Sequence, residues 1–244
     1  MYEEAPSRAV TGAVVWRARG PGSVVLPDGC MDLLWTGGRL LVAGPDTGPH
    51  PAGEVPGRAF AGLRLAPGTA PALLGVPACE LRDRRVELAD LWPGPDVRRL
   101  TERTAAHEDP CAALEALARA RLAAAAGPPD PLPAEVAARL RAGQPVAAIA
   151  RAVGLGERQL HRRSLDAFGY GPRTLGRVLR LQRALALARR GLPQAEVACA
   201  AGYADQAHLA REVRALAGTT MGAYAASVGA KSETPQPSGS STTA

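Results

Sequence analysis

The chain has 244 residues, 46% of them hydrophobic, which is long enough for two ordinary domains with buried cores. Its four cysteines stand far apart, with no CxxC pair and no histidine at ligand spacing, which argues against a disulfide scaffold or a zinc site. The formal net charge of +6 is unevenly placed: residues 133–226 carry 14 arginines against 6 acidic residues, whereas residues 1–132 carry 14 against 16. This imbalance favours a polyanionic partner, usually nucleic acid, for the second region.

Residues 1–126 have the pattern of a β-rich domain. Short apolar or alternating runs are separated by turn signals such as Pro27-Asp28-Gly29. The pair Gly37-Gly38 between two apolar runs predicts a tight hairpin. We expect strands at residues 13–18, 22–27, 31–35, 39–44 and 58–66, and then helices near 70–74 and 110–125.

A proline-rich connector at residues 127–132 precedes an almost wholly helical region at 133–226, and the polar residues 227–244 are expected to be disordered. The chain is thus predicted to be α+β, with a small barrel-like sheet plus helices in the N-terminal domain and an all-α C-terminal domain. The helices expected in the second domain are residues 133–142, 145–153, 156–168, 172–190, 194–201, 205–217 and 220–226.

The helical region contains an internal repeat. The segment at residues 149–169, IARAVGLGERQLHRRSLDAFG, matches VACAAGYADQAHLAREVRALAG at residues 197–218. This match indicates two copies of one structural unit. In each copy a short helix ends at a glycine turn (Gly154, Gly202), and the next helix has an apolar stripe containing Leu160 or Leu209. This is the pattern of a helix-turn-helix unit, and two basic units in tandem predict a DNA-binding domain.

The outward faces of the two second helices, residues 156–168 and 205–217, carry side chains suited to DNA. Arginine binds guanine bidentately and glutamine binds adenine in the same way. The helix that joins the two units is long enough to hold them near one DNA turn apart. Its arginines that lie away from the apolar stripe are either phosphate contacts or solvent-exposed. The candidates are Arg158, Gln159, His161 and Arg162 in the first unit, Arg173, Arg177 and Arg180 in the joining helix, and Asp205, Gln206, His208 and Arg211 in the second unit.

Residues 133–226 resemble the DNA-binding domain of the AraC/XylS family of bacterial transcription regulators. The segments IARAVGLGERQLHRR, GYGPRTLGRVLRLQRAL and GYADQAHLAREVRALAG carry the resemblance in the order and spacing of the family. It implies two units that enter adjacent major-groove segments of a promoter. Carried over by position, the base-reading residues are Arg158, His161, Arg162, Gln206, Ala207, His208 and Arg211.

The sequence departs from the family pattern at two positions. Ser164 stands where a large aromatic core residue is usual, and Met221 stands where a proline usually follows the second unit. The first half resembles, more loosely, an N-terminal domain found on one branch of these regulators, through LPDGCMDLLW, VAGPDTGPH, GLRLAPG and LRDRRVELADLW. That resemblance implies a sensing or dimerising domain.

We therefore expect a transcription regulator, without a cofactor, a bound metal or enzymatic activity, that binds double-stranded promoter DNA. Its N-terminal domain would modulate binding through a small-molecule effector or by forming a homodimer, and RNA polymerase is a further candidate partner. No apolar run reaches 18 residues and the first ten residues do not resemble a signal peptide, so a cytoplasmic location without membrane spans is expected.

The alternative is an enzyme with a site in the N-terminal domain. Polar residues near predicted turns could form such a site, although aspartate also favours turns for conformational reasons. A single-strand RNA-binding protein is disfavoured, since only 4% of residues are aromatic. The residues of the alternative enzyme site are Asp28, Cys30, Asp32, Asp46 and His50.

Overall fold

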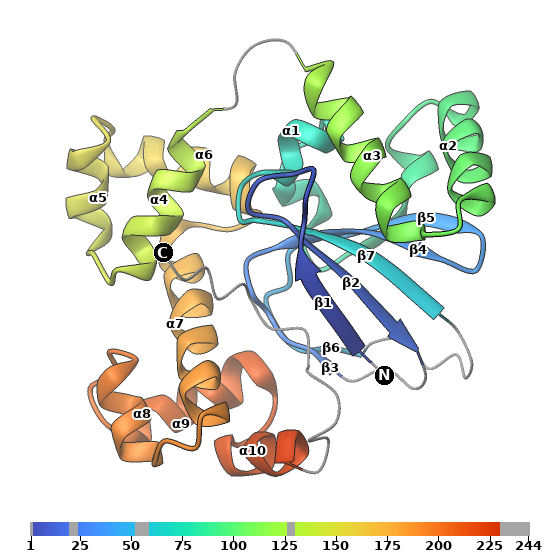
Figure 1. Ribbon diagram of the computed structural model, residues 1–244. Helices are drawn as coiled ribbons and strands as arrows, with labels where there is room; N and C mark the ends of the chain where they lie inside the picture. The colour runs from blue at the N-terminus through green and yellow to red at the C-terminus, as the bar shows by residue number, and fades with distance from the viewer. Residues whose placement is uncertain (1, 20–23, 52–58, 126–129, 230–244) are drawn as a thin grey trace.

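The computed structural model describes residues 2–19, 24–51, 59–125 and 130–229 (Figure 1). A β-rich N-terminal part with helices is followed by an all-helical C-terminal part, which confirms the predicted α+β class. Of the predicted connector at 127–132, the structure describes residue 130 onwards. The last helix, α10 (Met221–Gly229), continues beyond residue 226, where the sequence predicts it to end, and residues 230–244 lie outside the described part. No helix among the described residues is long and apolar enough to cross a membrane.

The main sheet has six antiparallel strands in the order β1-β2-β7-β4-β5-β8, and β3 pairs with β6 in a separate small sheet. Strand β7 is central, because Leu63 lies opposite Val15 of β2 on one side and Leu33 of β4 on the other. The strands are β1 (Tyr2–Pro6), β2 (Val14–Arg19), β3 (Val24–Val25), β4 (Met31–Thr36), β5 (Arg39–Ala43), β6 (His50–Pro51), β7 (Ala59–Leu65) and β8 (Arg85–Glu87).

The predicted hairpin is present. Thr36 pairs with Arg39 across the turn, and both glycines between them have positive φ, +56° at Gly37 and +75° at Gly38. Positive φ at both central residues is the type I′ geometry, whose twist matches that of the flanking strands. The glycine pair therefore fixes the register of β4 against β5.

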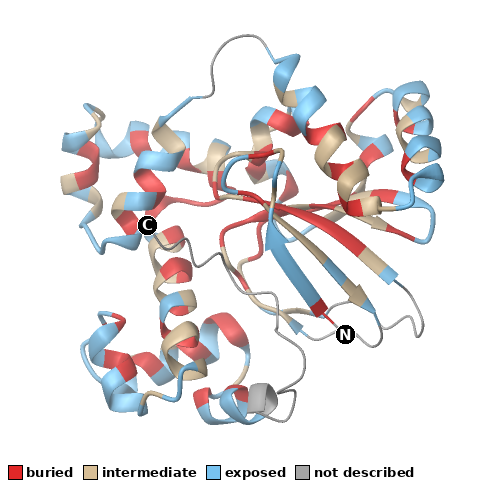
Figure 2. Cartoon of the chain, in the orientation of Figure 1, coloured by how far each residue is buried: buried red, intermediate tan, exposed pale blue. Residues whose placement is uncertain are grey.

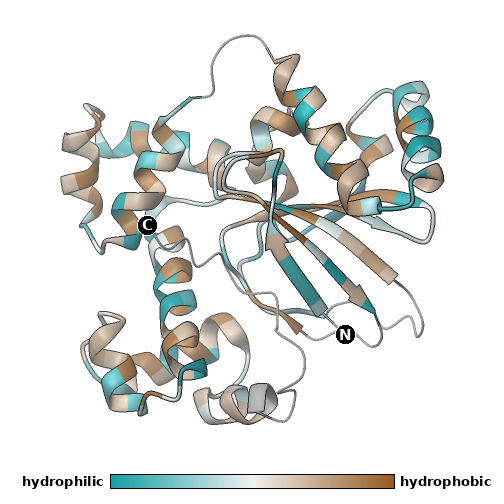
Figure 3. Cartoon of the chain, viewed as in Figure 1, coloured by the Kyte–Doolittle hydropathy of each residue, from teal (hydrophilic) through white to brown (hydrophobic). Residues whose placement is uncertain are grey.

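Helices cover one face of the sheet, where α3 (Pro110–Ala123) lies across β2, β4 and β7 (Figure 1). Buried residues of both layers meet here, among them Leu33, Leu63 and Leu114, and they form the core of the N-terminal part (Figure 2). Figure 3 shows hydrophobic positions, in brown, along both α3 and β7. The other elements of this part are α1 (Ala70–Leu74), the 3₁₀ turns η1 (Ala78–Leu81) and η2 (Leu88–Asp90), and α2 (Gly94–Ala106).

The C-terminal part contains two small cores that share one helix. Leu175 and Val178 of the long helix belong to a core with the three helices before it, whereas Leu181 and Leu185 belong to a core with the three helices after it. The helices are α4 (Leu132–Arg141), α5 (Val146–Ala152), α6 (Glu157–Phe168), α7 (Pro172–Arg189), α8 (Gln194–Ala200), α9 (Gln206–Ala217) and α10.

The two parts of the chain are in direct contact along α7 and the end of α6. Gln182 of α7 donates a hydrogen bond from Nε2 to the carbonyl oxygen of Pro27, at 2.6 Å. Arg82 donates from Nη1 to the carbonyl oxygen of Gly169, at 3.3 Å. A Cβ atom at Gly29 would lie 2.9 Å from Leu175 Cδ1, so the missing side chain lets this loop approach the helix closely.

Candidate nucleic-acid interface

The internal repeat is reproduced in the backbone of the two helix-turn-helix units. In the first unit the Leu155 amide donates to the carbonyl of Ala150 at 2.9 Å, and in the second unit the Tyr203 amide donates to Ala198 at 2.9 Å. The turn glycines between these residues have φ +69° and +79°, a conformation that residues with a Cβ rarely adopt. The two units, α5–α6 and α8–α9, therefore share one turn geometry.

Helix α6 presents the predicted face of the first unit to solvent. Arg158, Gln159, His161 and Arg162 are exposed, whereas Leu160 between them is 1% exposed and lies in the core. The helix begins after Gly156, which offers no side chain to cap the first turn. The first unit thus brings its four candidate residues together on one exposed surface.

Helix α9 presents the corresponding face of the second unit, and part of it is already engaged in local contacts. Asp205 is the N-cap residue, and its Oδ1 accepts a hydrogen bond from the His208 amide at 2.6 Å. The half-buried His208 ring meets the Tyr203 ring edge to face, with centroids 5.2 Å apart. Gln206 Nε2 donates to Gln194 Oε1 at 3.1 Å.

The remaining candidates of the second unit, Ala207 and Arg211, are exposed on the same face of α9. Gln206 is exposed as well, and its hydrogen bond to Gln194 lies on the surface, where a base could replace Gln194. Asp205, by contrast, has a role in helix capping that explains its presence without DNA. The side chains of this unit best placed to contact a base are therefore Gln206, Ala207 and Arg211.

The three candidate arginines of α7 differ in their surroundings. Arg173 is exposed, whereas Arg177 forms a two-point ion pair with Glu212 of α9, at 2.9 and 3.0 Å. The Arg180 guanidinium stacks 4.8 Å from the centre of the Tyr203 ring. Hydrogen bonding between Arg177 and Glu212 lowers the pKa of the carboxyl and raises that of the guanidinium. Arg177 and Arg180 therefore hold the second unit against the joining helix.

Glu212 forms an interhelical contact that the sequence pattern does not reveal. It lies one turn after His208 on α9, and it is outside the apolar stripe of that helix. Only the tertiary structure places Arg177 opposite it, 35 residues away in the sequence. This ion pair could be predicted from the sequence only if the packing of α9 against α7 were already known.

The two departures from the family pattern lie in the two cores. Ser164 is 1% exposed, and its buried hydroxyl has no hydrogen-bond partner. Met221 is buried in the second core, at the start of α10. Both residues lie away from the exposed faces of α6 and α9, so neither departure removes a candidate DNA contact.

The polar residues of the alternative enzyme site form a structural cluster around a buried arginine. Arg64 Nε lies 3.4 Å from Asp28 Oδ2 and 3.6 Å from Asp32 Oδ1. Burial raises the pKa of Asp28 and raises that of the Cys30 thiol well above its usual value. A thiol held in its protonated form is a poor nucleophile.

The other two residues of that site have separate surroundings. Asp46 pairs with Arg85 through both carboxylate oxygens, at 2.9 and 2.7 Å. His50 lies in β6, opposite Val25. Within the described part of the chain, no group of three or more histidine, cysteine or acidic residues is arranged to hold a metal ion.

Two helix-turn-helix units joined by a shared helix define a double helix-turn-helix DNA-binding domain. In agreement with this geometry, residues 134–227 match the family described as helix-turn-helix domain. Residues 13–87 match the family described as domain of unknown function DUF6597. The chain therefore carries an AraC-type helix-turn-helix domain, a DNA-binding domain of transcription regulators, behind a DUF6597 domain.

Among solved structures, the chain is similar to ToxT from Vibrio cholerae. An apo variant from strain SCE256 has a TM-score of 0.49 and 10% identity, over 90% of this chain and 98% of ToxT. ToxT from Vibrio cholerae O395 has a TM-score of 0.46 and 8% identity, over 92% and 96%. Wild-type ToxT bound to an unsaturated fatty acid has a TM-score of 0.48 and 11% identity, over 90% and 96%. No curated protein sequence matches the chain.

Proposed function

We propose that this protein is a sequence-specific transcription regulator that inserts α6 and α9 into adjacent major-groove segments of promoter DNA. The observation that carries the proposal is the pair of exposed polar faces at equivalent positions of two repeated units, with Arg162 on α6 and Arg211 on α9. An arginine at such a position can bind the O6 and N7 atoms of guanine bidentately. The joining helix α7 has 18 residues, about 27 Å at 1.5 Å per residue, which suits neighbouring groove segments.

The N-terminal part would modulate this binding through α7. Its loop at Pro27–Gly29 contacts Gln182 and Leu175 of that helix, and Arg82 contacts Gly169 at the end of α6. A conformational change in the N-terminal part would therefore be transmitted to α7, the helix that fixes the position of the two units relative to each other. Binding of a small-molecule effector and formation of a homodimer are the two inputs we propose, RNA polymerase is the proposed partner on the promoter, and the proposed location is the cytoplasm.

Selection of bound sequences from random duplex DNA with the full chain tests this function. We expect a preferred site with two conserved segments about one helical turn apart, because each recognition helix reads one major-groove segment. Enrichment of a single short segment would contradict the use of both units. Failure to enrich any duplex at low ionic strength would overturn the proposed function.

Replacement of Arg211 tests its role as a base reader. Arg211→Ala should weaken binding to the selected site by roughly 1–3 kcal/mol and relax the preference at one base pair. The control is Arg119→Ala, which removes an exposed arginine from α3, outside both helix-turn-helix units. Equal losses on selected and unrelated duplexes would show that Arg211 contacts phosphate instead of a base.

A further inference from the structure

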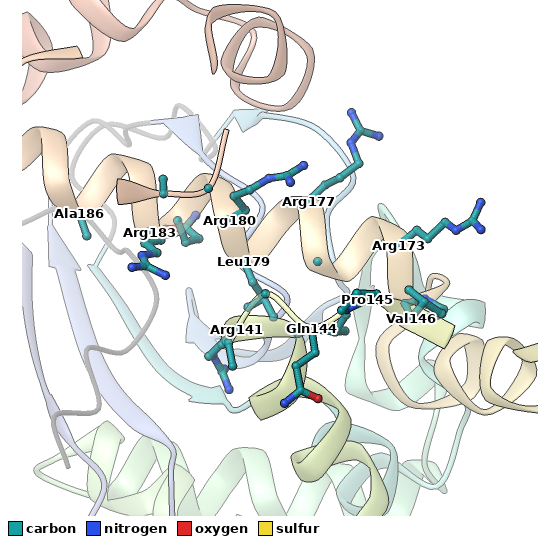
Figure 4. Close-up of a pocket in the computed structure, with 18 of the residues that line it drawn as sticks. Arg141, Gln144, Pro145, Val146, Arg173, Arg177, Leu179, Arg180, Arg183 and Ala186 are labelled. Atoms are coloured by element: carbon teal, nitrogen blue, oxygen red, sulfur yellow. The ribbon is translucent and has the colours of Figure 1, made fainter. Parts of the chain in front are cut away.

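A groove of about 770 Å³ runs over α7 between the two helix-turn-helix units (Figure 4). One wall is the turn between α4 and α5, including Gln144 and Pro145, and the opposite wall is the turn between α8 and α9, residues 200–202. The first wall leads into α5 of the first unit, and the second wall joins the two helices of the second unit. Anything that fills the groove contacts both units at once.

The groove is lined by arginines. Two of the five, Arg177 and Arg180, are engaged with Glu212 and Tyr203, as described above. The other three have exposed side chains, and within the described part of the chain they form no ion pair. The five are Arg141 at the end of α4 and Arg173, Arg177, Arg180 and Arg183 on α7.

Little negative charge opposes these arginines in the groove. Asp28 is the acidic residue that lines it, and the carboxylate of Asp28 faces the buried guanidinium of Arg64. Arg183 of α7 and Arg141 of α4 extend to the same side of the joining helix (Figure 4). The groove therefore has a net positive charge that no residue lining it neutralises.

The placement of these charges suits a phosphate chain. Arg173 and Arg183 are ten residues apart on one helix, which separates them by about 15 Å along its axis and by about 80° around it. Arg173 extends on the side of Arg177, and Arg183 on the side of Arg141 (Figure 4). A DNA segment whose major grooves receive α6 and α9 must pass its backbone across the surface between them. Guanidinium groups bind phosphate through two parallel N–H donors. They are also weakly hydrated, so their desolvation on contact costs little free energy.

We propose that this groove binds backbone phosphates of the DNA segment between the two recognition helices, through Arg141, Arg173 and Arg183. This inference rests on the proposed function and deepens it, since it adds Arg141 and Arg183 to the contacts expected from the sequence. Arg177 and Arg180 are positioning residues, because they act on DNA through α9. The contribution of the groove is independent of base sequence, as phosphate contacts position a protein on DNA without reading it.

The double variant R141A/R183A in the full chain tests the groove. Binding of a labelled duplex is measured by fluorescence anisotropy between about 50 and 200 mM salt, on the selected site and on a scrambled duplex. The slope of log affinity against log salt should fall by about 1.8, since each neutralised phosphate contributes about 0.9. Affinity should fall by the same factor on both duplexes.

Two matched variants complete the test. R98A/R119A removes the same charge from exposed positions on α2 and α3, and should leave the slope unchanged. R141K/R183K keeps the charge and should retain the slope, which separates electrostatics from loss of fold. Thermal melting of all variants by circular dichroism should coincide with that of the wild type; if R141A/R183A melts early, the single variant R183A carries the test, with an expected decrease of about 0.9.

The outcomes separate this inference from the proposed function. An unchanged slope in R141A/R183A, with site-specific binding intact, overturns the groove as a phosphate site and leaves the function standing. A loss of affinity confined to the selected duplex also overturns the groove as a phosphate site, because that pattern is expected of residues that contact bases. If inorganic phosphate binds the wild type but not the variant, and the slope stays the same, the groove takes a small free anion instead of DNA.

Discussion

The two helix-turn-helix units have the same turn geometry but are held in place by different means. The second unit is fastened to α7 by polar side chains, through the Arg177–Glu212 ion pair and the stacking of Arg180 on Tyr203. The first unit is bonded to the N-terminal part by Arg82, which donates to the carbonyl of Gly169 at the end of α6. Its recognition helix has no side-chain cap, whereas Asp205 caps α9.

This difference shows that sequence repetition does not imply equal roles. The second unit is pre-organised within the DNA-binding domain itself, so its reading face is fixed relative to the joining helix. Both units nevertheless touch the N-terminal part, because Leu26 packs against the second core and Arg82 bonds to the end of the first recognition helix. A signal from the N-terminal part is therefore expected to reach both units.

The largest expected effect comes from removing matching core leucines. Leu160→Ala and Leu209→Ala should each lower the free energy of unfolding by about 2–5 kcal/mol, because both side chains are 1% exposed and their removal leaves a cavity. Urea unfolding followed by circular dichroism measures this. A much smaller loss for Leu160→Ala would show that contacts with the N-terminal part, more than its own core, stabilise the first unit.

The next effect concerns the two helix starts. Asp205→Ala should cost about 0.5–2 kcal/mol, since it leaves the His208 amide without its acceptor. Gly156→Asp should instead stabilise α6 by a few tenths of a kcal/mol, because Gly156 has the extended conformation of a cap residue and open space around it. Thermal melting of both variants checks the pair. A loss at Gly156→Asp would mean that a cap cannot form in the first unit.

The smallest expected effect is the pH dependence of the ion pair. The folded-state pKa of Glu212 is lowered, so the pair contributes fully above the ordinary glutamate pKa of about 4.3, and its contribution is lost as the pH falls through the lower folded value. Arg177 is partly exposed to solvent, so we expect less than about 1 kcal/mol. Glu212→Gln should be less stable than the wild type at pH 7, and the difference should vanish at a pH below the lowered pKa of folded Glu212. A difference that is equal at both pH values would contradict this assignment.

The sequence predicts the helices of the C-terminal part well, because their apolar stripes recur every three or four residues and glycine or proline marks their ends. It predicts less of the N-terminal part. Strand β1 escapes detection because YEEAP is acidic and has only Tyr2 buried, as suits the edge of a sheet. The two-residue strand β6 and the three-residue strand β8 are too short to show a period.

The sequence pattern also does not predict helix α2, although Val97 and Thr104 mark its buried side. Its start at Gly94-Pro95 is typical of a loop when read without the tertiary structure. In the candidate interface, residue type and spacing predict most of the exposed side chains, whereas His208, Arg177 and Arg180 are only partly exposed. Residue type and spacing do not predict the tasks of Asp205, Arg177 and Arg180, since these depend on partners brought together by the fold.

The sharing of α7 between two cores restricts how the spacing of the target site can change. Inserting one residue in the middle of this helix would shift the second unit by about 1.5 Å and turn it by about 100° around the helix axis. Arg177 would then no longer face Glu212, and α9 would point away from the major-groove segment next to the one proposed for α6. Relatives with a different distance between their two operator segments are therefore expected to bend the DNA or gain whole helical turns, never to lengthen the joining helix one residue at a time.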